Sequence, residues 1–119
     1  MISFHNQSIA FKFKEKTKIK QWIKAVTEKE KYKLGTINYI FCTDDELLDI
    51  NVKHLNHNTL TDIITFDYTE GKTINSDIFI SIERVLENAE KFKVTFDEEF
   101  HRVMIHGILH LCGYKDKTK

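Results

Sequence analysis

Two histidines near the C-terminal end of the sequence have the spacing of a metal-binding pair. His106 and His110 are four positions apart, so on a helix their imidazoles lie one turn apart on one face and can reach the same ion. Gly113 and Asp116 follow seven and ten positions after His106. A glycine there can end the helix and turn the chain back, which brings the aspartate toward the imidazoles. The spacing predicts a metal site with two histidines and one carboxylate; the alternative is a histidine pair on an exposed helix face.

The four offsets also match a known class of zinc hydrolases. Metzincins carry H-E-x-x-H-x-x-G-x-x-H, in which a glycine ends the helix before the third ligand. Here the position after the first histidine is Gly107, and not the glutamate that metallopeptidases use as a general base. The pattern therefore favours a zincin-like metal helix near the C-terminus, and it makes a metallopeptidase the least favoured function.

Three stretches resemble one protein family. Residues 106–114, HGILHLCGY, are similar to the signature H-G-x-L-H-L-x-G-Y-D-H of the YbeY family of bacterial endoribonucleases. Residues 61–66, TDIITF, are similar to the T-D-V-L-S-F strand of that family, and residues 76–81, SDIFIS, to its G-D-I-x-I strand with serine for glycine. The histidine segment is the specific one of the three, and with the order of elements the resemblance spans most of the chain.

The resemblance implies an activity, a cofactor and partners. It implies a metal-dependent, single-strand-specific endoribonuclease, a hydrolase of RNA phosphodiester bonds, which matures the 3′ end of 16S ribosomal RNA and takes part in ribosome quality control. Ribosomal RNA and ribosomal subunits are the implied partners. His106 and His110 fall on catalytic metal ligands, and Asp116 falls where the family has a third histidine. One divalent ion is expected; zinc is preferred, but a carboxylate in the third place also suits iron or manganese, and nickel is a further alternative.

One functional position of the family is not matched. An arginine that the family carries before its T-D strand aligns with Leu55. If that arginine binds a phosphate, then His54, His57 or a lysine must replace it, so the two histidines are candidate substrate-binding residues. The departures at Leu55 and Asp116 leave a second hypothesis open, a ribosome-associated assembly factor with a weakened catalytic site.

Further details of the site follow from the same stretches. Asp62 is a candidate to hydrogen-bond a histidine ligand from behind, as carboxylates around metal sites commonly do; the alternative is that it caps a strand or turn. The attacking group stays open between a water activated by the metal and the 2′-hydroxyl of the RNA.

The hydrophobic pattern predicts one domain, residues 1–119, of the α+β class. Alternating apolar residues indicate strands at 9–13, 36–42, 61–68 and 77–81. Helical spacing and two capping boxes indicate helices at 16–33, from 43 onward, at 82–92 and at 95–111. Trp22 is expected on the buried stripe of the first helix, and Gly35 as its C-cap. A mixed sheet with helices packed on it is the expected architecture.

Charge and composition exclude several other classes. The net charge is zero, with 18 basic and 18 acidic residues, which excludes a generally basic nucleic-acid binder. Residues 12–33, however, hold nine lysines and three glutamates, and this +6 segment indicates either a surface that meets an RNA backbone or a solvated helix face. No apolar run is long enough to span a membrane and no signal-peptide pattern is visible. Cys42 and Cys112 are too few for a disulfide framework, so both are expected to be buried thiols of a cytoplasmic protein.

Overall fold

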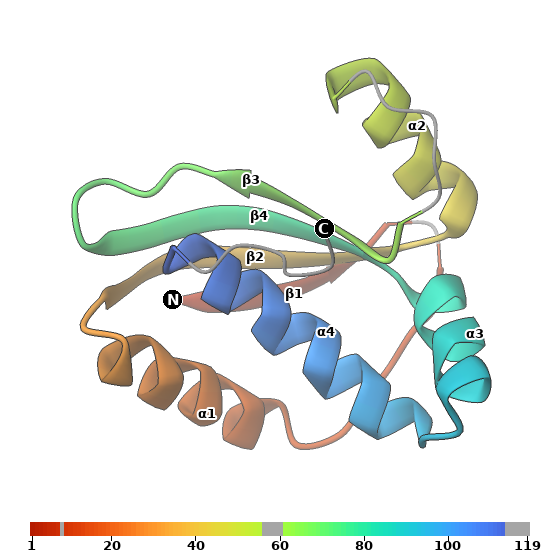
Figure 1. The fold of residues 1–119 in the computed structure, drawn as a ribbon, viewed down its shortest axis with the longest axis horizontal. Coiled ribbons are helices and arrows are strands. Elements are labelled where there is room, and N and C mark those ends of the chain that lie inside the picture. The colour runs from red at the N-terminus through yellow and green to blue at the C-terminus, as the bar shows by residue number, and fades with distance from the viewer. Residues whose placement is uncertain (8, 56–60, 114–119) are drawn as a thin grey trace.

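The computed structural model describes residues 1–7, 9–55 and 61–113, without the side chains of residues 54 and 55. Within these ranges no helix is long and apolar enough to cross a membrane. The elements follow the predicted order and confirm the α+β class (Figure 1): β1 (Ile2–Asn6), α1 (Lys16–Lys29), β2 (Lys33–Cys42), α2 (Asp44–Leu55), β3 (Ile63–Asp67), β4 (Thr73–Ser81), α3 (Ile82–Phe92) and α4 (Phe96–Leu111).

The strands form one mixed sheet in the order β1-β2-β4-β3. β1 runs parallel to β2 and β2 runs parallel to β4, whereas β3 is antiparallel to β4. The register places Tyr39 beside Ile78 and Ile78 beside Thr65. In this strand order β3 is an edge strand of the described sheet.

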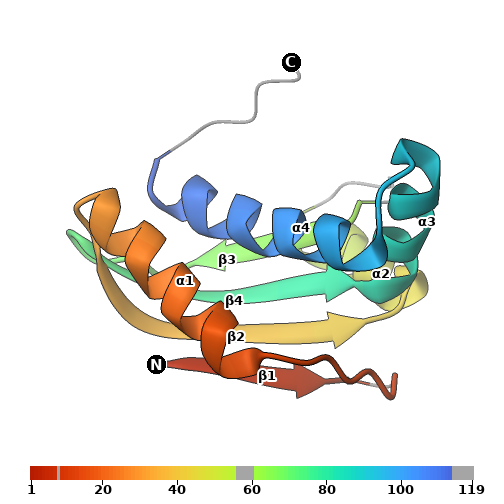
Figure 2. The same cartoon turned by 90° about the horizontal axis from the view of Figure 1, so that it is seen from below.

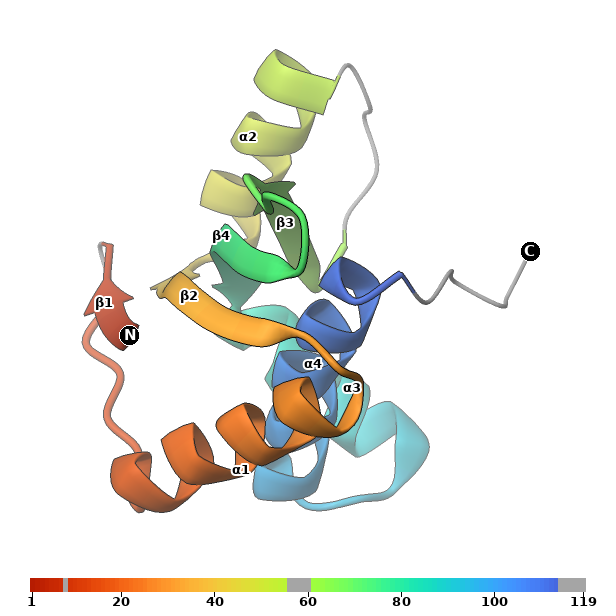
Figure 3. The same cartoon turned by 90° about the vertical axis from the view of Figure 1, so that its left-hand side faces the viewer.

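The helices divide unequally between the two faces of the sheet. α1, α3 and α4 lie on one face and α2 projects from the other (Figure 3). The larger core lies under the three helices, and a small second cluster of Cys42, Leu47 and Ile64 lies under α2. On the three-helix face, α4 packs over β3 and β4 while α1 packs over β2 (Figure 2). Consequently α1 and the edge strand β3 flank α4 from opposite sides.

The first predicted strand is wrong. The first strand of the sheet is β1, residues 2–6, and residues 9–13 belong to the connection that leads to α1. Phe11 and Phe13 do turn inward, and their rings pack on Phe41 with centroids 5.2 and 5.6 Å away. Alternating burial is thus real in this segment, but without strand pairing it does not make a strand.

Two expectations for the first helix are also corrected. α1 ends at Lys29 with Glu30 as its C-cap, and Lys31 takes the left-handed conformation at φ 67°. Gly35 lies instead inside β2, where a Cβ would come 2.6 Å from the carbonyl oxygen of Ile74. The tight approach to β4, and not helix capping, explains the glycine at position 35.

Trp22 is not on the buried stripe of α1. Its side chain is 39% exposed, and its ring meets that of His101 edge-on, with 6.0 Å between the centroids.

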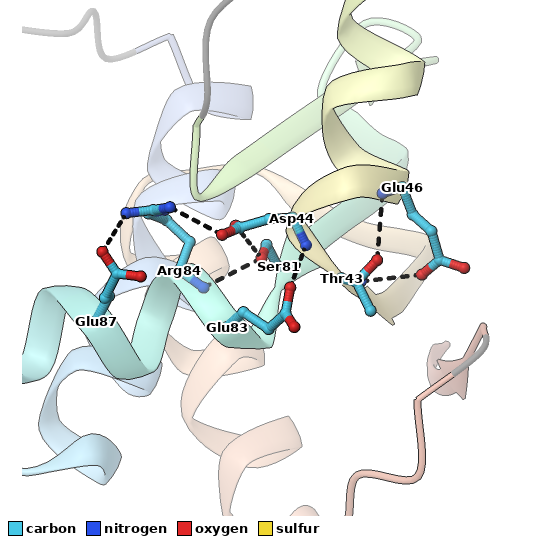
Figure 4. Close-up of polar contacts among 7 residues, drawn as sticks. All are labelled: Thr43, Asp44, Glu46, Ser81, Glu83, Arg84 and Glu87. Carbon is cyan, nitrogen blue, oxygen red and sulfur yellow. Dashed lines mark hydrogen bonds and ion pairs between the residues drawn. The ribbon is translucent and has the colours of Figure 1, made fainter.

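A polar cluster ties the start of α2 to the start of α3 (Figure 4). The Asp44 backbone N–H donates to Glu83 at 2.8 Å, and the Ser81 hydroxyl donates to Asp44 at 2.7 Å. Arg84 donates from Nη2 to Asp44 at 2.8 Å and from Nη1 to Glu87 at 2.9 Å. We call these five residues the Arg84 cluster. It fixes α2 on one side of the sheet relative to α3 on the other.

Candidate metal centre

α4 carries both histidines and starts at a predicted capping box. The Thr95 hydroxyl accepts from the Glu98 N–H at 3.1 Å, and the Thr95 N–H donates to the Glu98 carboxylate at 2.8 Å. His106 and His110 are exposed beside the stripe of the helix that faces the sheet. The buried residues of that stripe are Glu99, Phe100, Val103, Met104, Gly107, Ile108 and Leu111.

Both imidazoles line one small pocket between α4 and the edge strand. Its volume is about 100 Å³, and it is lined by Ile63, Thr65, His106, Gly107 and His110. α4 supplies the two imidazoles and β3 supplies the opposite wall. The spacing of four residues therefore does place two nitrogen donors at one hollow, as the sequence suggested.

Gly107 allows α4 to lie this close to β3. A Cβ at this position would stand 3.0 Å from Cδ1 of Ile63 and 3.4 Å from Cγ2 of Thr65. Such contacts are tighter than ordinary packing, so any larger residue would push the helix away from the strand. The position that holds the general base in metallopeptidases serves here in packing, and it brings no carboxylate to the pocket.

The donor set of the pocket fits a divalent transition metal. Neutral imidazoles bind zinc, iron and nickel, and two on adjacent turns can share one ion. Among the described residues, no three histidines, cysteines or acidic residues lie close enough to hold an ion together. Asp116, the predicted third ligand, lies outside the described residues, so the zincin-like arrangement of three ligands stays a prediction. His57 also lies outside them, and the side chain of His54 is not described.

Asp62 directly precedes Ile63, the residue of β3 that lines the pocket. Its carbonyl accepts from the Ser81 N–H at 3.1 Å, which ties it to the end of β4. Burial raises the pKa of the Asp62 carboxyl above its usual range, while the positive charge of Arg102 and, more weakly, His106 act in the opposite direction. The predicted role of Asp62, orienting the imidazole, is compatible with this place and stays a prediction.

Two charged residues of α4 were not anticipated from the sequence. The Glu99 side chain is 2% exposed. Arg102 donates two hydrogen bonds to it, from Nε to Oε1 at 3.0 Å and from Nη2 to Oε2 at 2.6 Å. The same Nη2 lies 3.6 Å from Oδ2 of Asp62. We call Asp62, Glu99 and Arg102 the Arg102 cluster. A sequence signal existed, because Arg102 precedes His106 by four residues and so shares its face of the helix.

The two cysteines do not contribute a reactive group. Both are free and buried, as predicted. Burial, strengthened by the carboxylates of Glu46, Asp44 and Glu83, raises the pKa of Cys42 to about 12. Burial also raises the pKa of Cys112. Because the thiolate is the nucleophile and the metal ligand, these thiols are inert at neutral pH.

The fold and the pocket together define a small α+β protein with a candidate metal centre where a two-histidine helix meets the edge of a mixed sheet. The family model described as Endoribonuclease YbeY matches residues 1–119. The chain belongs to the YbeY family.

Curated relatives support this membership. A protein of Flavobacterium psychrophilum named Endoribonuclease YbeY is 58% identical over 118 residues, which cover 99% of this chain and 84% of that protein. A protein of the same name from Flavobacterium johnsoniae is 53% identical with the same coverage of both chains. A solution structure of a Thermotoga maritima protein matches all of this chain and 77% of its own, with a TM-score of 0.60 and 28% identity. The likeness therefore extends over the whole domain.

Proposed function

We propose that this protein is a metal-dependent endoribonuclease that cleaves single-stranded RNA in the cytoplasm. Its substrate in this proposal is ribosomal RNA, at the maturing 3′ end of 16S, on ribosomal subunits that pass through quality control. The observation that carries the proposal is the pocket of α4, which two imidazoles share. Membership of a family whose curated relatives are named endoribonucleases supports the choice of RNA as substrate.

His106 and His110 would hold one divalent ion in this pocket, with Asp116 as third ligand. Zinc is the preferred ion; iron and manganese are alternatives because a carboxylate in the third place suits them, and nickel is a further alternative. When bound, such an ion supplies a Lewis acid that polarises a phosphoryl oxygen and makes a nearby water more acidic. Asp62 would keep the His106 ring in place by accepting its second N–H. Ile63 and Gly107 close the side of the pocket that faces the apolar core.

The products of cleavage identify the attacking group. Attack by the neighbouring 2′-hydroxyl leaves a 2′,3′-cyclic phosphate, whereas attack by water leaves a linear phosphate. Mass spectrometry of the fragments, and a substrate with one 2′-deoxy sugar at the cleaved position, separate these mechanisms. Cleavage of the deoxy substrate at an unchanged rate would exclude the 2′-hydroxyl.

The lysine-rich segment belongs to this proposal as a surface for the RNA backbone. α1 packs on the β2 side of α4 and the pocket lies on the β3 side, so an RNA that reaches both must cross α4. Each lysine that contacts a phosphate of single-stranded RNA adds about 0.7 to the slope of log affinity against log salt. Replacing the exposed Lys18 and Lys24 with glutamine should lower this slope for long RNA and leave cleavage of a short RNA unchanged.

His54 and His57 are proposed to contact the substrate in place of the arginine that aligns with Leu55. If either does, its replacement by alanine raises KM and leaves metal content at the wild-type level. An unchanged KM in both variants would remove them from the substrate site.

The proposal is tested by metal analysis paired with a cleavage assay. The protein is purified without chelators, its metal content is measured, and it is incubated with single-stranded and double-stranded RNA. We expect about one ion per chain and cleavage of the single strand. His110→Ala should lose both. His101→Ala is the matched control, because this histidine is on the same helix but packs on Trp22 of α1, and it should retain both.

Two results would contradict the proposal. Cleavage by metal-free His110→Ala protein would exclude the metal mechanism. A wild-type protein that holds no metal and cuts no RNA, yet binds ribosomal subunits, would instead favour the assembly factor with a weakened site. Asp116 and Leu55, which depart from the pattern of the family, are the features that keep this second function in view.

A further inference from the structure

The Arg102 cluster contains a charge that the proposed mechanism does not use. Glu99 is a carboxylate on the buried side of α4, 2% exposed, while the Arg102 side chain that neutralises it is 52% exposed. Burying an ionised carboxylate is unfavourable unless a partner compensates its charge. A helix that only had to pack on the sheet would need neither residue, so the pair calls for a role beyond packing.

The geometry shows what the pair can do. Two hydrogen bonds to Glu99, at 3.0 and 2.6 Å, hold the planar guanidinium of Arg102 in one orientation. In that orientation Nη2 faces Oδ2 of Asp62 at 3.6 Å. The Asp62 backbone is in turn held by Ser81 at 3.1 Å. Asp62 is therefore constrained at both its backbone and its carboxylate.

The first histidine of the pocket, His106, lies close to Arg102 on the same helix. Arg102 and His106 are one helical turn apart on the same face of α4, and Asp62 directly precedes Ile63, which lines the pocket opposite His106. A carboxylate has two oxygens, so Asp62 can face Arg102 through one and accept an imidazole N–H through the other. We propose that Arg102, anchored on the buried Glu99, is a positioning residue that holds Asp62 against His106 and thereby sets the orientation of this imidazole for metal binding.

The charges in the cluster argue against a different role for Arg102. An arginine near the pocket could be taken for a phosphate-binding replacement of the residue that aligns with Leu55. Its one positive charge, however, faces the two carboxylates of Glu99 and Asp62, so the cluster as a whole does not attract an anion. Arg102 thus acts on the protein side of the histidine. This inference rests on the proposed function, since it needs His106 to be a metal ligand.

The test measures metal affinity and not activity alone. Metal-free protein is titrated with Zn²⁺ and Co²⁺ in competition with a chromophoric chelator. Partners that orient metal ligands typically contribute 10- to 100-fold in affinity. We expect Asp62→Asn to weaken binding within this range. Arg102→Lys keeps the positive charge near Glu99 but lacks the planar fork that can face two carboxylates, so we expect a loss of about tenfold.

A double-mutant cycle shows whether Arg102 acts through Asp62. If it does, Arg102→Lys causes no further loss of affinity in the Asp62→Asn background. Glu99→Gln removes the buried charge and one anchor of the guanidinium without leaving an unpaired ion, so it should also weaken metal binding. Arg84→Lys is the matched control, because it makes the same change at the other arginine that pairs with two carboxylates, and it should keep wild-type affinity.

The outcomes separate this inference from the function on which it rests. Wild-type affinity in Arg102→Lys and Glu99→Gln, or losses that multiply in the double variant, would overturn the positioning role and leave the proposed function standing. A wild-type protein that binds neither ion would overturn both. Equal losses in Arg84→Lys and Arg102→Lys would show a general effect of arginine removal, and would also overturn the inference.

Discussion

The only two arginines of the chain, Arg84 and Arg102, each face two carboxylates, but they do so in different surroundings. Arg84 joins Asp44 of α2 to Glu87 of its own helix, where both carboxylates reach solvent and that of Asp44 is 19% exposed. Arg102 joins the buried Glu99 of its own helix to Asp62, which precedes β3 and is 23% exposed. The Arg84 cluster links the starts of two helices. The Arg102 cluster joins α4 to the start of β3, one helical turn before the first histidine of the pocket.

This difference shows that an arginine paired with two carboxylates takes its role from the residues that surround the cluster. The Asp44 carboxylate also accepts from the Ser81 hydroxyl, and the Asp44 backbone N–H donates to Glu83 (Figure 4). These bonds join members of the Arg84 cluster to one another where α2 and α3 begin. Asp62 instead directly precedes Ile63, which lines the pocket together with His106. The first arrangement stabilises the fold, and the second is the one that we propose to act on the metal site.

The largest effect is expected from truncating the two arginines. Arg102→Ala leaves the buried Glu99 carboxylate without its partner, which should lower the free energy of unfolding by about 3 kcal/mol. Arg84→Ala leaves Asp44 with its bond from Ser81 and with access to water, and should cost about 1.5 kcal/mol. Urea unfolding followed by circular dichroism measures both. Equal losses would remove the distinction in burial between the two clusters.

Gly107→Ala tests how closely the pocket side of the molecule is packed. Overpacking against Ile63 should cost about 2 kcal/mol, and the better helix propensity of alanine should return about 1 kcal/mol. We expect a small net loss of stability together with weaker Zn²⁺ binding, because the added methyl group lies in the wall of the pocket.

Gly71→Ala provides the control for that substitution. Gly71 has φ 58° and open space around it, so alanine there costs about 1 kcal/mol through its backbone conformation alone. Its metal affinity should equal that of the wild type. A Gly107→Ala protein that binds Zn²⁺ equally well would show that α4 can shift without consequence for the histidines.

The two capping boxes allow a finer comparison of the helix starts. Thr43 and Glu46 cap α2 with bonds of 3.2 and 2.9 Å, as Thr95 and Glu98 cap α4. Thr95→Ala should lower stability by about 1 kcal/mol. Thr43→Ala should cost about half as much, because the Arg84 cluster still holds Asp44. Thermal unfolding of both variants measures the difference, and a larger loss at Thr43 would contradict the role given to the cluster.

At neutral pH the smallest effect is expected at Cys42, which lies near the carboxylates of the Arg84 cluster. Its pKa is raised from 9.0 to about 12, so the folded state keeps the thiol proton to higher pH than the unfolded state. This contribution to stability is present below pH 9 and is lost as the pH rises from 9 to 12. At pH 8 iodoacetamide should not modify Cys42 in folded protein and should modify it in urea. Fast modification of the native protein would contradict the burial.

Much of the fold could be predicted from local sequence signals. The capping boxes at Thr43 and Thr95 fixed two helix starts, because they depend on residues three positions apart. The segment 9–13 misled the prediction, since phenylalanines that alternate in burial are found in a packed connection as well as in a strand. Gly35 misled it for a related reason: its neighbour Ile74 is distant in the chain, and only the pairing of β2 with β4 reveals the close approach.

The sequence by itself determined the histidine pair, its helix and the family resemblance, because a spacing of four residues and a capping box are properties of contiguous chain. Only the tertiary structure decided which strand forms the other wall of the pocket and which charges stand behind His106. Asp62 and Glu99 are 37 positions apart, and no local rule brings them to one guanidinium. The sheet does so, because the hairpin of β3 and β4 places Asp62 at the edge over which α4 must pack to bury its apolar stripe.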